Sequence, residues 1–569
     1  MLFRSAYRLL GKRVTGVDNE KIVRGQPLFG IDQRVPGMLF ATFTKSPAIG
    51  GRAVSANLDH VRTLPGVKNA FIVAEQGNPL LFDLSGAPAV LSGVAIVATT
   101  TWSAMQAKKA LQVQWDESNA SHDSWKAAVA EAKRLSAQKP AEVLGQAGNV
   151  DAAFAETKPV EALYTYHYVS HADLEPQNCT AWFKGDSVEI WAPTQTPQAA
   201  VDAIAALLGL PKDKVLLHQL RGGGGFGRRL ANDSVCEAVL VSKQAGGIPV
   251  KVQWMREDDM GFDYYRSGGF QSFKAALDKS GRLTAYENHF IGFTMDGKTP
   301  VSAGNIDKAE FPANVLGVQR MAQSLIPSKI PTGPWRAPGS NVNAFCIQSF
   351  LNECAVAARR DYPEFLVELM GEARALPPDP FGGVFHTGRA VSVIKAVAER
   401  AQWGRKLPEG RALGVAYNHG GAWNCQIGEV VEVSVDRASG AIKVHKVWAV
   451  ADPGTAIQPK HLRQQLETGI IWGMSAGLRE QIVIKGGEVQ HSNFYDYPVP
   501  RMDEVPEIEI HIVEGAQGQV SGAGQIGVAP MAPAIANAVF RLTGVRMREL
   551  PMLPVRVKTA LNEQTVKTA

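Results

Sequence analysis

The glycine-rich run at residues 221–229 constrains this chain more than any other segment. It reads Arg-Gly-Gly-Gly-Gly-Phe-Gly-Arg-Arg. Backbone without side chains can approach an anion or an oxo group closely, because a Cβ would block that approach. The run follows a strand-like stretch at 215–220 and precedes a helix-like stretch at 233–243. This setting predicts a loop that cradles a cofactor, and the alternative is a flexible connector, which rarely mixes phenylalanine and paired arginines into its glycines.

Composition describes an ordinary globular protein with room for more than one core. The 569 residues are 45% hydrophobic and 20% charged, and the formal net charge of +5 is small for this length. The arginines are scattered, so we expect no nucleic-acid partner. The five cysteines form no C-x-x-C pair, which argues against an iron–sulfur cluster or a zinc site in this chain. We find no run of about 18 apolar residues that would span a membrane and no clear signal peptide.

The order of strand-like and helix-like segments predicts an α+β fold, with mixed α/β organisation and mixed sheets. We expect an N-terminal extension at 1–23, a small α/β unit at 24–116 and a helical linker at 117–159. The region 160–569 follows, with two subdomains that meet near 380–410. Segments 429–435, 443–450 and 507–513 alternate polar and apolar residues, which indicates a sheet with one solvated face.

Two segments end in turns that present a polar side chain. Gln195 follows a strand and a proline turn, where its amide can donate to a cofactor oxygen or remain solvated. Arg336 lies in a proline- and glycine-rich turn before a long helix, where it can meet an anion or serve only the turn.

Two further segments combine small residues with glutamine. Gln465 belongs to a helix that continues through Gly469 and Gly473, whose small size suits helix packing or close cofactor approach. Gly524 and Gln525 lie in a Gly-Ala-Gly-Gln loop before a helix, and a helix N-terminus favours anionic or oxo ligands.

His171 and Glu175 are spaced i, i+4 in the segment His-Ala-Asp-Leu-Glu-Pro. This spacing suits a metal, but no third ligand is near, so a hydrogen-bonded pair is the preferred interpretation.

Together these motifs resemble the large subunits of the xanthine oxidase family of molybdenum hydroxylases. Within it they resemble the branch of isoquinoline 1-oxidoreductase beta subunits and membrane-associated aldehyde dehydrogenases. The resemblance is collinear from about residue 24 to 554. The matching segments are 30–32, 36–39, 171–176, 191–195, 222–229, 335–339, 492–494 and 533–538.

The resemblance implies a hammerhead-like small domain followed by molybdopterin-binding domains. It implies a molybdopterin cofactor, with a cytosine dinucleotide form as one option, and the hydroxylation of an aldehyde or an N-heterocyclic aromatic small molecule. Electrons would leave through a small [2Fe–2S] subunit, with a cytochrome c subunit as a further candidate. Gln195 would donate to the molybdenum oxo group. The other implied cofactor-binding residues are Gly224, Gly225, Phe226, Gly227, Arg336, Gln465 and Gly524.

Two departures from the family pattern stand out. The family places a glutamate base where this chain has Gln525, and a neutral amide cannot take a proton; loss of a general base costs about 10²–10⁴ in rate. The Glu-Met-Gly-Gln-Gly and Gly-Gly-Ser segments that wrap the pterin in relatives are also not found. We therefore expect a separate chain to complete the cofactor cage, unless this is a processed or truncated subunit or binds no molybdenum.

Two other functions compete with this one. The first is a catalytically impaired or non-catalytic scaffold subunit of the same complex. The second is a dinucleotide-binding enzyme, because residues 222–227 fit G-x-G-x-x-G; the acidic residue expected about 20 positions on is missing, since Glu237 falls within the helix. Trp423, Phe262 and Tyr265 are candidates for a substrate pocket. By resemblance the complex would work in the periplasm, with membrane association through partners, and otherwise in the cytoplasm.

Overall fold

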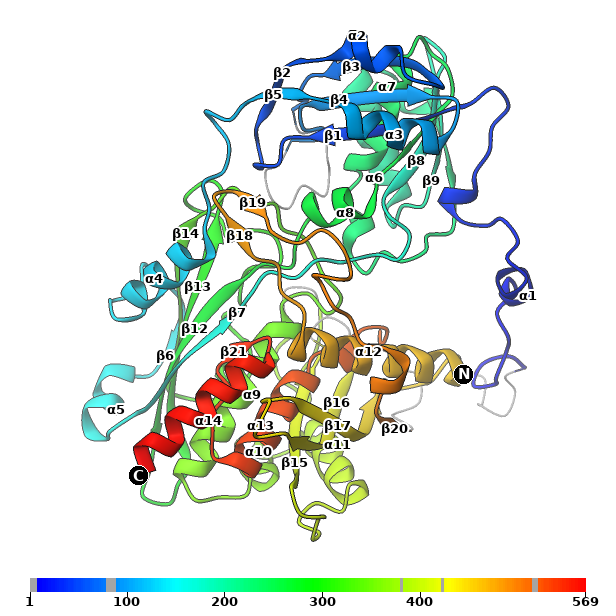
Figure 1. Ribbon diagram of the computed structural model, residues 1–569. Coiled ribbons are helices and arrows are strands. Elements are labelled where there is room, and N and C mark those ends of the chain that lie inside the picture. The colour runs from blue at the N-terminus through cyan, green and yellow to red at the C-terminus, as the bar shows by residue number, and fades with distance from the viewer. Residues whose placement is uncertain (1–7, 78–87, 379–381, 421–423, 514–519, 569) are drawn as a thin grey trace.

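Three large sheets carry the fold. The computed structural model describes residues 8–77, 88–378, 382–420, 424–513 and 520–568. Its sheets have seven, six and four strands and are mixed in direction, with helices packed on their faces (Figure 1). The predicted α+β class is therefore confirmed.

The seven-stranded sheet joins segments that are far apart in the sequence. β1 pairs parallel with β11 and antiparallel with β4, so strands from residues 39–98 continue directly into strands from 178–253. Whether 24–116 forms a domain of its own stays a prediction. In order across the sheet the strands are β10 (Val215–Gln219), β9 (Val188–Ala192), β8 (Asn178–Phe183), β11 (Val250–Gln253), β1 (Leu39–Lys45), β4 (Gly93–Ala98) and β3 (Val67–Val73).

Helices cover both faces of this sheet. Ile204 and Val239 pack against Ile190 of β9 in one core, while Ala107 packs with Ile96 in a small core at the other end. The helices concerned, and the strand pair beside them, are α2 (Leu58–Arg62), α3 (Thr101–Ala110), α6 (Pro197–Leu208), α7 (Asp233–Gln244), β2 (Arg52–Ala56) and β5 (Val113–Asp116).

The six-stranded sheet takes its edge strand from the predicted helical linker. Residues 117–159 do contain two helices, α4 (Trp125–Ser136) and α5 (Val150–Glu156), but β6 lies between them and pairs with β14. The sequence analysis missed this strand. The order across the sheet is β21 (Glu549–Leu550), β7 (Val160–Tyr166), β12 (Gly269–Leu277), β13 (Leu283–Thr294), β14 (Gln319–Pro327) and β6 (Glu142–Ala147).

The four-stranded sheet is covered on both faces over residues 411–435, so the expectation of one solvated face is wrong for that part of the sheet. A Cβ on Gly428 would lie 2.9 Å from Val397 of α11, and one on Gly414 would lie 2.0 Å from the Ala534 carbonyl of α13. Glu429 and Glu432 of the alternating pattern are therefore buried, whereas Glu507 on the edge strand stays exposed. The elements are β15 (Arg411–His419), β16 (Gln426–Val435), β17 (Ile442–Asp452), β20 (Glu507–Ile512), α11 (Thr387–Arg400) and α13 (Met531–Thr543).

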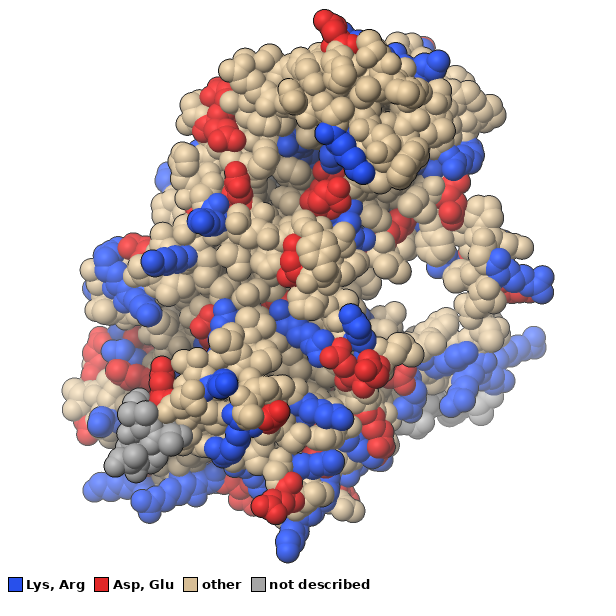
Figure 2. Space-filling model, viewed as in Figure 1, with Lys and Arg blue, Asp and Glu red and all other residues tan. Residues whose placement is uncertain are grey.

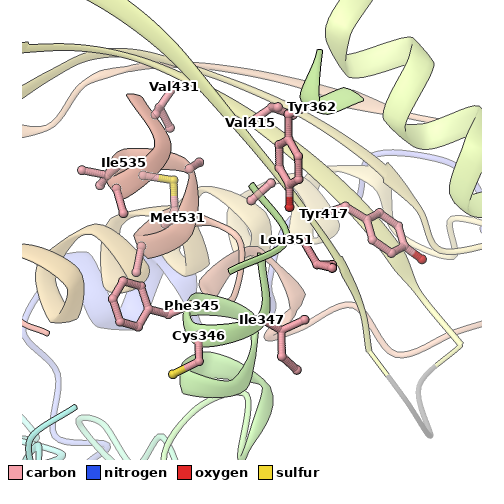
Figure 3. Close-up of a cluster of buried hydrophobic side chains, with 14 of the residues drawn as sticks. Phe345, Cys346, Ile347, Leu351, Tyr362, Val415, Tyr417, Val431, Met531 and Ile535 are labelled. Carbon is pink, nitrogen blue, oxygen red and sulfur yellow. The ribbon is translucent and has the colours of Figure 1, made fainter. Parts of the chain in front are cut away.

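A large apolar core joins the six- and four-stranded sheets. Figure 3 shows Phe345 on the side of Met531, with Ile535 and Val431 beyond it, all within one buried cluster that also contains Cys346. One window of α13 and the turn before it, Ile526–Thr543, is long and apolar enough to cross a membrane, yet 83% of it is buried, so it is a core helix. The remaining elements are α8 (Arg256–Gly261), α9 (Ser340–Ala357), α10 (Tyr362–Met370), α12 (Pro459–Leu478), α14 (Pro554–Thr568), β18 (Ile484–Lys485) and β19 (Glu488–Val489).

The N-terminal segment bridges the two halves of the molecule. Its helix α1 (Asn19–Val23) has no buried residue. The Gly11 N–H donates a hydrogen bond to the Ile457 carbonyl at 2.9 Å. Phe29 forms an isolated β-bridge with Arg221, next to the glycine loop. Figure 2 shows an opening between this segment and the body, and charges of both signs interspersed on this face.

Candidate functional site

The glycine loop lies between β10 and α7, as predicted, and it packs closely on the strand-end turn that carries Gln195. The Gly227 N–H donates to the Gln195 Oε1 at 3.2 Å, and a Cβ on Gly225 would lie 2.7 Å from the same oxygen. Because Oε1 is occupied by this bond, the Nε2 group of the exposed Gln195 points away from the loop as a donor. The structure thus brings these two predicted segments together.

The turn that carries Arg336 meets the glycine loop at Gly227. Gly227 has φ +119°, and a Cβ there would lie 1.5 Å from the Pro334 carbonyl oxygen. No other residue type fits this contact. The neighbouring Phe226 ring packs at a tilt of 44° against Trp472 of α12, with centroids 4.1 Å apart.

Arg336 gathers the C-terminal half of the predicted site around its guanidinium. Its Nη2 donates to the Gln465 Oε1 at 3.0 Å and to the Gly524 carbonyl at 2.5 Å. Arg336 is only 8% exposed, and burial lowers its pKa to about 10. Among the described residues no carboxylate forms an ion pair with it, so its positive charge is left without compensation within this part of the chain.

Gln525 faces the same cluster from the other side. Its Oε1 accepts a hydrogen bond from the Ala337 N–H at 3.0 Å. This bond orients the carboxamide so that its NH₂ group is free to donate. Among the described residues no carboxylate hydrogen-bonds to Gln525, so the expected base has no local substitute.

The backbone of these loops is strained where they meet. Seven described residues other than glycine have a positive φ, and three of them are Ala172 (+47°), Phe226 (+50°) and Ala337 (+62°). They lie in the His-Ala-Asp-Leu-Glu-Pro segment, the glycine loop and the Arg336 turn. Each costs about 1 kcal/mol or more, and such strain concentrates where function over-determines the structure.

The prediction that His171 and Glu175 form a hydrogen-bonded pair is wrong. The His171 Nδ1 lies 3.0 Å from Asp263 and its Nε2 lies 3.0 Å from the Pro334 carbonyl oxygen. Glu175 instead accepts from the Ile31 N–H at 2.8 Å and from the Gly223 N–H at 2.5 Å. The segment is not helical, so the i, i+4 spacing does not bring the two side chains together.

A buried ionic layer supports the glycine loop, and the sequence analysis missed it. Arg228 is 1% exposed and forms bidentate hydrogen bonds with Asp233 at 2.9 and 2.8 Å. Arg229 donates to the Gly224 carbonyl at 2.8 Å and lies 3.7 Å from Asp173. The paired arginines after the glycines were the available signal, since buried arginines require acidic partners.

The candidate substrate-pocket residues separate in the structure. Phe262 lines a mainly apolar cavity of about 340 Å³ that also contains Lys45 and Asp263. Tyr265 is fully buried and donates its hydroxyl hydrogen to the Met260 carbonyl, so it is a core residue. Trp423 lies outside the described residues.

The five cysteines are buried and free, and burial raises the pKa of each thiol. In the ranges that the structure describes, no group of three His, Cys, Asp or Glu side chains is placed to hold a metal ion. Glu237 is bonded to Lys45 and Trp254 inside the core, so it cannot serve as the acidic residue of a dinucleotide site.

Two family models match regions that contain the glycine loop, Gln195, Arg336 and Gln465. Both describe a molybdopterin cofactor-binding domain, over residues 135–365 and 388–506. The isoquinoline 1-oxidoreductase subunit beta of Brevundimonas diminuta is 30% identical over 97% of this chain and 69% of its own length. The chain belongs to the xanthine oxidase family of molybdenum hydroxylase large subunits. Its cofactor is molybdopterin.

Other relatives agree in sequence or in fold. A membrane-bound aldehyde dehydrogenase [pyrroloquinoline-quinone] of Gluconacetobacter polyoxogenes is 29% identical over 98% of this chain and 73% of its own length. The quinoline 2-oxidoreductase of Pseudomonas putida 86 has the same fold, with a TM-score of 0.79 at 16% identity over 97% of this chain and 98% of that one. Names such as "subunit beta" mark relatives as parts of multi-subunit complexes.

The residues present fit such a cofactor. The decisive feature is the buried Arg336, which among the described residues bonds to carbonyl, amide and hydroxyl oxygens but to no carboxylate. A buried cation without a counter-charge is costly, and an anionic group such as a phosphate would compensate it. The exposed amides of Gln195 and Gln465 add donors beside it.

Proposed function

We propose that the cradle formed by the glycine loop, Gln195, Arg336, Gln465, Gly524 and Gln525 holds the molybdopterin cofactor. The observation that carries this proposal is the contact network. It joins residues 195 to 525 into one site through Gly227, Pro334 and Arg336. When bound, the cofactor supplies the two-electron oxidation of a substrate carbon.

The chain's own residues would bind and orient rather than carry protons. Gln195 and Gln525 each have one amide face fixed by a backbone N–H. Each therefore presents its NH₂ group as a donor in a defined direction. Gln525 can hold an oxygen ligand in place, but it cannot remove its proton.

We propose an aldehyde or an N-heterocyclic aromatic as the substrate. The printed names of the two relatives quoted above, an aldehyde dehydrogenase and an isoquinoline oxidoreductase, support these two classes. Aromatic side chains at the cradle, Phe226 and Trp472, suit a planar apolar molecule.

Partner chains and location are also part of the proposal. A small [2Fe–2S] subunit would accept electrons, with a cytochrome c subunit further along, and a separate chain would complete the cofactor cage. Two observations support partner chains. The described cysteines are buried and free, and the cradle residues Gln195 and Gln465 are exposed to solvent, where another chain can reach them. Work in the periplasm, with membrane association through partners, rests on the resemblance alone.

A second candidate function is a scaffold subunit that retains the cofactor without turnover. The orientation of Gln525 favours it, because no carboxylate among the described residues replaces the missing base.

Molybdenum analysis of the complex, purified with its partner chains, tests the cofactor proposal. We expect about one molybdenum per chain in the wild type and about tenfold less or lower in Arg336→Leu, because a buried charge-assisted contact contributes roughly 1.5–3 kcal/mol. Arg282→Leu removes an exposed arginine paired with Asp278 and should retain molybdenum. A complete wild-type complex without molybdenum would refute the proposal.

Turnover separates the two candidate functions. If the complex oxidises an aldehyde or N-heterocycle and loses this activity in Gln525→Ala while keeping molybdenum, the scaffold function is excluded.

A further inference from the structure

His171 lies between the two walls of the cradle. The first wall is the glycine loop at 222–227 with Gln195, and the second is the turn at 333–337 with Gln465, Gly524 and Gln525. The His171 side chain is 1% exposed. The Nδ1 lies 3.0 Å from Asp263 Oδ1, and the Nε2 lies 3.0 Å from the carbonyl oxygen of Pro334. Both partners are hydrogen-bond acceptors.

A neutral imidazole has one N–H and can satisfy only one of these acceptors. Exchanging the tautomer moves the deficit to the other nitrogen and does not remove it. We infer that His171 is held as a buried imidazolium that clamps the Pro334 carbonyl against Gly227 and so locks the two walls of the cradle together.

The charges around the ring agree with this state. Burial alone would lower the pKa of His171, but the Asp263 carboxylate outweighs it and the pKa is raised. Burial would raise the pKa of Asp263, yet His171 and Arg228 bring it to about 2. Asp173, whose pKa burial raises, also faces the ring, and the Arg228 Nε lies 3.1 Å from the same Asp263 Oδ1.

The Pro334 carbonyl that His171 holds is already in close contact with Gly227. A Cβ on Gly227 would lie 1.5 Å from the Pro334 oxygen, so the loop and the turn touch through backbone alone. Gly227 also donates to Gln195, and Arg336 follows Pro334 by two residues. His171 is therefore a positioning residue: its ring bonds to Asp263 and Pro334 rather than to the side chains of Gln195, Arg336, Gln465 or Gln525, yet it fixes the distance between the glycine loop and the Arg336 turn. Its functional consequence rests on the proposed cofactor site, whereas its charge state does not.

Nitrogen NMR of histidine-labelled protein tests the charge state directly. At pH 7 we expect one of the 12 histidines to show two protonated ring nitrogens that persist well above the ordinary histidine range. His289 is the matched reference, because it is buried, bonds only to Ser324 and has its pKa lowered to about 4 by burial. His171→Gln assigns the signal; if that variant does not fold, the shift of the signal in Asp263→Asn assigns it. A neutral His171 ring at pH 7 would overturn the inference.

Amide hydrogen exchange of the cofactor-free protein tests the locking. His171→Gln should accelerate exchange by about tenfold or more in residues 222–227 and 333–337 together, since one charge-assisted hydrogen bond is lost. His289→Gln should leave both segments unchanged. Acceleration in only one segment, or in neither, contradicts the coupling of the walls.

Molybdenum retention by the complex gives the functional measurement. Asp263→Asn keeps an acceptor for Nδ1 but removes the charge, so the His171 pKa falls. Molybdenum retention in this variant should then drop about tenfold as pH rises from 5 to 8 and recover on acidification. Retention by the wild type should not change over this pH range. A loss of molybdenum that does not depend on pH would contradict the role of the His171 charge. Absence of molybdenum from the wild-type complex would refute the cofactor proposal but would not affect the NMR result.

Discussion

The two walls of the cradle each contain a buried arginine, and they differ in how its charge is compensated. Under the glycine loop, Arg228 is fully buried but paired with Asp233 and lies 3.1 Å from Asp263. On the facing wall Arg336 is nearly as buried, yet its hydrogen bonds go to carbonyl, amide and hydroxyl oxygens. The comparison teaches that one arginine builds the site and the other is kept available to a ligand.

The largest expected effect is on kcat, and it concerns Gln525, which stands where the family has a glutamate base. Gln525→Glu places a carboxylate beside the uncompensated Arg336, which would keep it ionised as a proton acceptor. We expect kcat to rise by about 10²–10⁴ if proton removal limits turnover. Steady-state kinetics with an aldehyde substrate measures it; an unchanged kcat at full molybdenum content would mean that another group or another step controls the rate.

The two arginines should respond oppositely to removal of their charge. Arg228→Leu leaves buried carboxylates unpaired and should destabilise the cofactor-free protein by about 3–5 kcal/mol. Arg336→Leu removes a charge that has no partner among the described residues and should cost less than about 1 kcal/mol. Urea unfolding monitored by fluorescence gives both values. Equal losses would erase the distinction between the walls.

The contact between the walls should be the least tolerant of a methyl group. Gly227→Ala combines a left-handed backbone with a Cβ inside the Pro334 carbonyl, and we expect a loss of about 3 kcal/mol or more. Gly185→Ala is the matched control, because Gly185 has φ +92° but nothing within 4 Å of an added Cβ. Its cost should be the backbone strain alone, about 1 kcal/mol. The melting temperatures of the two variants test the difference.

The smallest effect lies away from the cradle, at a buried carboxyl of β16. Glu429 is fully buried, neither of its oxygens has a hydrogen-bond partner among the described residues, and burial raises its pKa well above the ordinary value. Because the folded protein keeps the proton that the unfolded chain releases, wild-type stability falls as pH rises above about 4. Glu429→Gln should thus add about 1–3 kcal/mol at pH 8 and almost nothing at pH 4. A constant difference across pH would mean that Glu429 is ionised in the fold.

Local patterns predicted much of the fold. The expected strand at 215–220 and helix at 233–243 correspond to β10 (Val215–Gln219) and α7 (Asp233–Gln244), because hydrophobic period and turn residues act over a few positions. Edge strand β6 was missed because its six residues mix polar and apolar types without a regular alternation; its place in the sheet comes from pairing with β14. The alternation in β16 misled for a related reason: α11 and α13 come from distant sequence and cover both faces.

Sequence alone determined which residues of the cradle are chemically suited to it: the glycines at 222–227, the amides at 195, 465 and 525 and the arginine at 336. These properties belong to residue type and local spacing. Only the tertiary structure decided that His171 faces Asp263 and Pro334 rather than Glu175. It also decided that, among the described residues, Arg228 is paired with a carboxylate and Arg336 is not. Charge compensation depends on which distant carboxylates are brought within hydrogen-bonding distance, and no local pattern encodes that.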